Sequence, residues 1–196
     1  DLPEAEKQRL MAAYRRFVQR HLYFHGEHRT FLSKNPSFTP FMATLADAFP
    51  DARFIGCLRN PTAAVPSQIN SIVIGGKLFD GRDTADYWRE GFLAMLDYYY
   101  RHLLEQLDGL PEGRGALSVM ETLAAAPGES VSGFYRTFGW TPSPAYRAFL
   151  DGEDRRAAAY RSGHRYSLEN LGVDPGRLAA TFGWVYDRFG YPRPGD

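Results

Sequence analysis

The stretch FIGCLRNPTAAVPS, residues 54–67, decides the fold, because it joins an apolar run to a helix start through a basic turn. Residues 53–58 are predicted to form a strand that is apolar on both faces, as strands of parallel sheets are. Asn60 is a favoured helix cap, and Pro61 is a favoured first helical residue. We therefore expect a helix over residues 61–74, which the glycine pair that follows brings to an end.

Apolar periodicity on either side of this stretch predicts further helices and strands. The predicted helices cover residues 4–24, 38–49, 84–107, 127–138, 144–160 and 175–190. The other predicted strands cover residues 30–33 and 116–120. Short apolar strands that alternate with helices indicate an α/β fold with a central, mostly parallel sheet flanked by helices. Three strands are few for such a sheet. Because the chain also opens on a helix without an initiator methionine, we expect the sheet to be incomplete at the N-terminus.

The composition is that of one globular domain over residues 1–196. Hydrophobic residues make up 44% of the chain and charged residues 23%, and the formal net charge is zero. A neutral protein has no general attraction for nucleic acid or for an anionic membrane surface. Any anionic ligand must therefore be held by a local site.

Cys57 is the only cysteine, and its place in the apolar run predicts a buried thiol. One cysteine forms no internal disulfide, so nothing indicates an oxidising compartment. No apolar stretch reaches membrane-spanning length, and the first residues do not resemble a signal peptide. We therefore expect a cytoplasmic protein without a membrane span.

Arg59, Ser67 and the start of the helix between them form a candidate phosphate site. Parallel sheets bind ligands at the carboxyl ends of their strands, where two of the predicted strands end in Lys34 and Arg59. The helix after Arg59 is expected to present free backbone N–H groups and the positive end of its dipole, and Ser67 lies on its second turn. The alternative is that Lys34 and Arg59 are solvated strand-end charges and that Ser67 is a helix-surface hydroxyl.

The run FLSKNPSFTPFMATLADAFPDARFIGCLRNPTAAVPS, residues 31–67, resembles the bacterial branch of the sulfotransferases that use 3′-phosphoadenosine 5′-phosphosulfate (PAPS). The shared features are Lys34 with a proline two residues later, the FPDAR segment, the Arg-Asn-Pro turn, and a serine eight residues after the arginine. The resemblance implies that Arg59 and Ser67 bind the 3′-phosphate of PAPS and of its product, adenosine 3′,5′-bisphosphate (PAP). It also implies a P-loop-like three-layer fold.

Two later stretches are similar to the same family. Residues 118–123, SVMETL, resemble its strand and Glu-Asp-Leu segment, with Thr122 where aspartate is usual. Residues 163–172, GHRYSLENLG, resemble a late loop near the cofactor. The PAPS-binding candidates that this loop and its start supply are Arg161, Gly163, His164 and Tyr166. The alternative is an ordered loop that binds no ligand.

Sulfuryl transfer requires that the acceptor be aligned with the donor and that charge developing on the leaving oxygen be neutralised. The resemblance puts Lys34 near that oxygen, which makes Lys34 the catalytic candidate. No metal is expected, because a lysine can supply the positive charge. Pro36 stands where some sulfotransferases have a histidine base, so no base is assigned. The family's 5′-phosphosulfate loop, an Arg-Ser-Gly-Thr type turn, is missing from the sequence. Either it lies upstream of Asp1 or the protein no longer performs the transfer.

Three functions are compatible with these features. The first is a sulfotransferase that moves a sulfuryl group from PAPS to a hydroxyl or amine of a small molecule or glycan. The second is a non-catalytic fragment that binds PAP or a protein partner. The third is a P-loop kinase-like phosphotransferase, because both families use a strand-to-helix phosphate cradle. The sequence assigns neither the acceptor nor the oligomeric state.

Two other clusters are interpreted as structural. His21 and His25 stand four residues apart, but no matching ligand accompanies them, so no metal site is expected. Tyr98, Tyr99 and Tyr100 lie in a long amphipathic helix, where packing in the core is favoured over stacking on a ligand.

Overall fold

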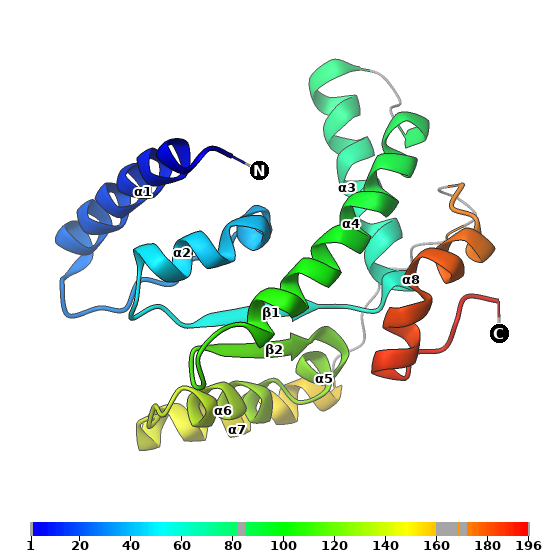
Figure 1. Ribbon diagram of the computed structural model, residues 1–196. Coiled ribbons are helices and arrows are strands. Elements are labelled where there is room, and N and C mark those ends of the chain that lie inside the picture. Colours follow the sequence, from blue (N-terminus) through cyan, green and yellow to red (C-terminus); the bar gives the residue numbers. More distant parts are fainter. Residues whose placement is uncertain (1, 82–84, 160–167, 169–171, 196) are drawn as a thin grey trace. The chain divides into compact units, whose positions relative to one another are not determined.

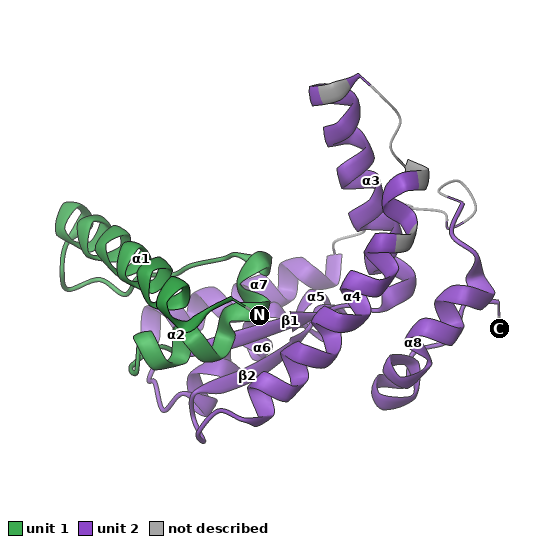
Figure 2. Ribbon diagram, turned by 45° about the horizontal axis from the view of Figure 1, so that its top comes forward, with its two compact units in different colours: residues 1–52 green, residues 53–196 purple. Residues whose placement is uncertain are grey.

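The structure is a computed structural model that describes residues 2–81, 85–159, 168 and 172–195 (Figure 1). The chain divides into two compact units, unit 1 with residues 1–52 and unit 2 with residues 53–196 (Figure 2). The single domain expected from the sequence therefore stays a prediction. Within the described ranges, none of the helices has both the length and the apolar character that crossing a bilayer requires.

Unit 1 consists of helix α1 (Glu4–His25), the 3-10 helix η1 (Pro36–Phe41) and helix α2 (Met42–Ala48). The ring of Tyr14 on α1 packs edge-on against Phe38 and Phe49, with centroids 5.0 and 5.8 Å away. The Tyr14 hydroxyl donates a hydrogen bond to Ser33 Oγ at 3.0 Å. Aromatic packing of this kind holds the elements of unit 1 together.

Residues 30–33 do not form the strand that the sequence predicts. They lie in a stretch without regular structure that continues to Asn35. A strand is stabilised by a ladder of backbone bonds to a neighbour, whereas side chains fix this stretch. Ser33 accepts a hydrogen bond from Tyr14, and Asn35 accepts one from the backbone N–H of Ser37 at 3.0 Å, which caps η1.

Unit 2 is built on two parallel strands, β1 (Phe54–Leu58) and β2 (Gly115–Val119), and is otherwise mostly helical (Figure 1). Helix α4 (Ala85–Asp108) packs closely on the sheet because Gly56 has no side chain. A Cβ at Gly56 would lie 2.8 Å from Leu103 and 2.7 Å from Leu107 of α4. The α/β class and the parallel pairing are confirmed, and the part of the chain that the structure describes contains two strands in place of the expected three.

Strand β1 is buried on one face only. Gly56 and Leu58 are buried, whereas Ile55 is 42% exposed and Cys57 is exposed. The prediction that the Cys57 thiol is buried is therefore wrong, and the strand, although apolar on both faces, is buried on one of them. The physical reason is that both faces of a strand are buried only where helices cover the sheet on both sides. Here α4 packs against β1, while the helices over residues 120–125 and 127–137 contact β2.

Strand β2 leads into helices α5 (Met120–Ala125), α6 (Pro127–Thr137) and α7 (Pro144–Ala159). Asp154 on α7 caps α6, because its carboxylate accepts the backbone N–H of Gly128 at 2.7 Å and that of Glu129 at 3.2 Å. Helices α6 and α7 approach so closely that a β-carbon at Gly128 would overlap the carbonyl oxygen of Leu150.

Helix α3 (Pro61–Asp80) is longer than predicted. It continues through Gly75 and Gly76 and ends at Gly81, whose φ of 68° is left-handed. Glycine weakens a helix by about 1 kcal/mol but keeps both backbone hydrogen-bonding groups. Helix α3 packs along α4 up to the buried Val73, and it continues across the glycine pair although Ile74 and Leu78 on either side of the pair are exposed. The two helices form a pair that projects from the sheet (Figure 1).

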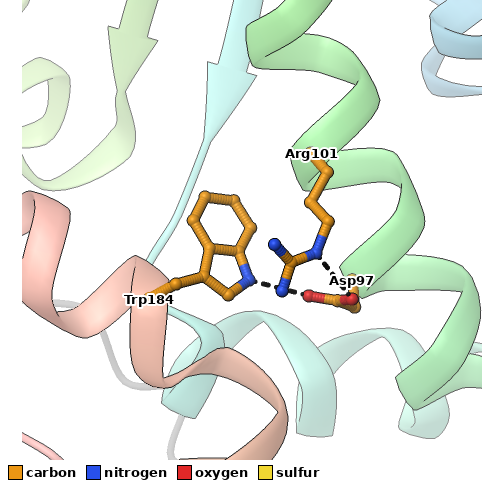
Figure 3. A network of polar contacts seen from close by, with 3 residues as sticks. All are labelled: Asp97, Arg101 and Trp184. Carbon is orange, nitrogen blue, oxygen red and sulfur yellow. Dashed lines mark hydrogen bonds and ion pairs between the residues drawn. The ribbon is translucent and has the colours of Figure 1, made fainter.

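Helix α8 (Pro175–Phe189) packs against α3 and α4. The core that these helices share with β1 includes the buried residues Leu58, Val65, Ile69, Leu93, Leu178, Phe182 and Val185. At the margin of this core, Trp184 donates to Asp97 at 2.8 Å and Arg101 donates to Asp97 at 3.0 Å (Figure 3). The Arg101 guanidinium also lies 4.5 Å from the centroid of the Trp184 ring. This cluster ties α8 to α4.

Candidate functional site

The turn from β1 to α3 is formed by Arg59, Asn60 and Pro61. Asn60 caps α3, because its Oδ1 accepts the backbone N–H of Thr62 at 2.9 Å. Pro61 is the first helical residue and is fully buried. The helix start that the sequence predicts is therefore confirmed. This start places the exposed Arg59 at the carboxyl end of β1.

The first turn of α3 does not present free N–H groups, which corrects the expectation from the sequence. The Thr62 N–H donates to the Asn60 side chain, and the N–H groups of Ala63 and Ala64 donate to the Asn60 carbonyl oxygen, each at 2.9 Å. Pro61 has no N–H. Because Asn60 satisfies these donors, an anion at this end of α3 meets the dipole and the neighbouring side chains rather than open amides.

Arg59 and Ser67 are the two predicted phosphate-binding residues that unit 2 contains in its described part. Both belong to the β1–α3 segment, with Ser67 half-buried on the second turn of the helix. The carbonyl oxygen of Ser67 accepts the Ser71 hydroxyl at 2.9 Å. In the described ranges, the Arg59 guanidinium forms no ion pair.

A single peptide group within this turn is bound from both sides. The Arg59 carbonyl oxygen accepts the Tyr100 hydroxyl at 2.7 Å, and the Asn60 N–H donates to Glu121 Oε1 at 3.0 Å. Tyr100 lies on α4, and Glu121 lies in the first turn of α5. Burial raises the pKa of the Tyr100 hydroxyl, and the nearby Glu121 charge adds to the increase while that of Arg59 opposes it.

Sequence reasoning missed the roles of Tyr100 and Glu121. It placed Tyr98, Tyr99 and Tyr100 in the core; Tyr100 is buried, whereas Tyr98 is 50% exposed and does not follow the prediction. A signal was present, because a buried tyrosine hydroxyl usually requires a hydrogen-bond partner. The resemblance covered Glu121 within residues 118–123 without giving it a function. Neither contact is readable from spacing, because 41 residues separate Tyr100 from Arg59 and 61 separate Glu121 from Asn60.

Two tyrosines near the C-terminus reach the same turn. The Tyr186 hydroxyl on α8 lies 2.9 Å from Thr62 Oγ1, and the Tyr191 hydroxyl donates to Glu121 Oε2 at 2.9 Å. Burial is the main cause that raises the pKa of each hydroxyl, and the hydrogen bond to Glu121 raises that of Tyr191 further. Segments far apart in the sequence therefore support the start of α3.

The structure does not relate the other predicted site residues to this turn. Lys34 is exposed in unit 1, whereas Arg59 and Ser67 belong to unit 2, and each unit is described by itself. The remaining candidates lie outside the described residues; these are Arg161, Gly163, His164 and Tyr166.

Comparisons with known proteins agree with the resemblance seen in the sequence. The sequence profile of the sulfotransferase family matches residues 2–141. The fold is similar to the crystal structure of sulfotransferase STF9 from Mycobacterium avium, with a TM-score of 0.66 and 19% sequence identity. The match covers 83% of this chain and 42% of that one, so this chain spans less than half the length of STF9. A search of curated proteins gave no match.

The structural match establishes the likeness in fold, and the profile match covers well over half of the sequence. The chain belongs to the sulfotransferase family.

Proposed function

We propose that this chain carries the 3′-phosphate-binding part of a PAPS-dependent sulfotransferase with a P-loop-like three-layer fold. The observation that carries the proposal is the exposed Arg59 guanidinium, held at the start of α3 in a chain of the sulfotransferase family. A guanidinium offers parallel N–H donors that match two oxygens of one phosphate. In a protein of zero net charge, such a local cation is what an anionic nucleotide requires.

The 3′-phosphate is held by three contributions in this proposal. Arg59 supplies charge-assisted hydrogen bonds, Ser67 supplies a hydroxyl, and the N-terminal end of α3 supplies its dipole. The amides of the first turn do not take part, because Asn60 already binds them. We assign Arg161, Gly163, His164 and Tyr166 to the nucleotide as further PAPS-binding residues, on the resemblance alone.

The proposed reaction moves a sulfuryl group to a hydroxyl or amine of a small molecule or glycan. A bond forms between the acceptor oxygen or nitrogen and sulfur, while the bond from sulfur to the bridging oxygen of the 5′-phosphate breaks. PAP leaves, and the acceptor proton passes to a base that we do not assign. Lys34 is proposed to stabilise the charge on the leaving oxygen, which is the task that most strongly lowers the barrier to such transfers.

The test is a calorimetric titration of the full-length protein with PAP and, separately, with 5′-AMP, which lacks the 3′-phosphate. We expect PAP to bind more tightly. The Arg59→Ala variant should lose about 1.5–3 kcal/mol of PAP binding, the range for a hydrogen bond to a charged group. Ser67→Ala should lose less, about 0.5–1.5 kcal/mol, because its hydroxyl is neutral.

The matched control is Arg147→Ala, which removes an exposed arginine from α7. It lowers the net charge by the same amount but lies outside the β1–α3 segment, so PAP affinity should stay within twofold of wild type, roughly the effect of a screened surface charge. Equal affinity for PAP in wild type and Arg59→Ala would remove Arg59 from the site. Equal affinity for PAP and 5′-AMP in wild type would overturn the 3′-phosphate site itself.

A further inference from the structure

We propose that Glu121 is a positioning residue of the phosphate site, which acts with Tyr100 to clamp the peptide group between Arg59 and Asn60. The inference rests on the proposed function, because it explains how Arg59 is directed at the 3′-phosphate. Neither side chain touches the nucleotide in this proposal. Both act through the backbone of the turn.

The geometric argument starts from one planar peptide. The carbonyl of Arg59 and the N–H of Asn60 belong to the same peptide group, and in a trans peptide they point in opposite directions. Tyr100 binds the carbonyl at 2.7 Å from α4, and Glu121 binds the N–H at 3.0 Å from α5. With a partner on each side, the plane of this peptide cannot rotate without breaking a hydrogen bond.

Fixing this plane fixes the direction of the Arg59 side chain. The orientation of the peptide sets ψ of Arg59, and hence where its Cα–Cβ bond points relative to the start of α3. Asn60 is constrained as well, because the residue before a proline avoids helical angles, and its ψ of 124° is in the extended range. The clamp and Pro61 together leave the turn one arrangement.

The charge of Glu121 argues for this role. A carboxylate close to a phosphate site weakens anion binding by repulsion, so electrostatics alone does not favour a glutamate here. Both of its oxygens are engaged, Oε1 by the Asn60 N–H and Oε2 by the Tyr191 hydroxyl at 2.9 Å. Tyr191 thus holds the Glu121 side chain in place, and Glu121 holds the backbone between Arg59 and Asn60. Its geometric and electrostatic effects on PAP binding have opposite signs.

These opposite signs define the experiment, which compares Glu121→Ala and Glu121→Gln in the full-length protein. If Glu121 positions the turn, Glu121→Ala should weaken PAP binding about 10-fold, equivalent to about 1.4 kcal/mol. Glu121→Gln keeps a carbonyl oxygen for the Asn60 N–H and should remain within about threefold of wild type. If the carboxylate acts only through its charge, both variants bind PAP more tightly, and the proposal is overturned.

The control variant is Glu105→Ala, which removes an exposed carboxylate from α4 and should leave PAP affinity unchanged. Tyr100→Phe tests the other side of the clamp without changing Glu121. It removes a neutral hydroxyl donor and keeps the ring, so PAP binding should weaken about threefold. Unchanged affinity in Tyr100→Phe would overturn the two-sided clamp. This variant also keeps the proposal testable if Glu121→Ala does not fold.

A measurement without ligand separates this proposal from the proposed function. Hydrogen exchange of the backbone N–H of Asn60, measured by NMR, should be slow in wild type and in Glu121→Gln. In Glu121→Ala the exchange should be faster by about 10-fold or more. Unchanged exchange in Glu121→Ala would overturn the clamp, whatever the protein binds. A different result is faster exchange in Glu121→Ala together with equal affinity of the wild-type protein for PAP and 5′-AMP. It would overturn the 3′-phosphate site and, with it, the role given to the clamp.

Discussion

The hydroxyl of Tyr186 lies 2.9 Å from Oγ1 of Thr62, and this hydrogen bond joins α8 to the first turn of α3 across 124 residues of sequence. Tyr186 is 1% exposed, so its hydroxyl has little access to water. The contact therefore links the C-terminal helix to the segment that carries Arg59.

We expect this pair to be energetically coupled. Tyr186→Phe and Thr62→Val each remove one hydroxyl, and the double variant removes both. The coupling free energy from urea unfolding of the four proteins should be about 0.5–1.5 kcal/mol, the usual net value of such a bond. A coupling energy near zero would show that the two hydroxyls do not depend on each other in solution.

Alkaline pH should destabilise the fold through its buried tyrosines. Burial raises the pKa of Tyr100 above the value of about 10 in an unfolded chain. Because the folded state then holds its proton more tightly, this contribution is fully present below about pH 10 and is lost as pH rises from there toward the raised pKa.

The measurement is the free energy of unfolding between pH 8 and 12 in wild type and Tyr100→Phe. The wild-type curve should fall above about pH 10, and the slope in Tyr100→Phe should be shallower by up to about 1.4 kcal/mol per pH unit. Tyr87→Phe is the control, since Tyr87 is 77% exposed, and its slope should match wild type. Identical slopes in all three proteins would show that Tyr100 does not contribute.

Gly128 should not tolerate a side chain. A β-carbon there would overlap the carbonyl oxygen of Leu150, and backbone atoms cannot move aside as a side chain can. Gly128→Ala should therefore lower the free energy of unfolding by roughly 2 kcal/mol or more. Gly133→Ala on the same helix is the matched control. Its nearest neighbour is the tip of Arg136 at 3.7 Å, so it should be neutral or stabilising by up to about 1 kcal/mol.

Lys34→Ala should affect turnover more than nucleotide binding. In the full-length protein with an added hydroxyl acceptor, the rate at which PAP is formed from PAPS should fall roughly 10²-fold or more. Losses of this size are typical when an enzyme loses one donor that stabilises developing charge. PAP affinity should change little. Lys7→Ala removes a lysine from α1 and should leave both quantities unchanged. A Lys34→Ala protein with wild-type turnover would take Lys34 out of the mechanism.

Local chemistry made much of unit 2 predictable. The Asn60 cap with Pro61, the apolar run of β1 and the Asp174 cap of α8 are short-range signals, and each marks an element start that the structure contains. Weaker signals failed. Gly75 and Gly76 did not end α3, because glycine only weakens a helix and keeps its backbone hydrogen-bonding groups. Residues 30–33 did not form a strand, because backbone pairing rather than propensity makes one.

For the candidate site, too, some features follow from local sequence and others only from the tertiary structure. The sequence by itself determined the family, the helix start at Pro61, and the choice of Arg59 and Ser67, because those features lie within a few residues of one another along the chain. Only the tertiary structure decided what surrounds them. It showed that Tyr100 and Glu121 hold one peptide group of the turn from two sides. Hydrogen bonds between residues distant in sequence depend on how helices and strands pack, and no local pattern encodes that packing.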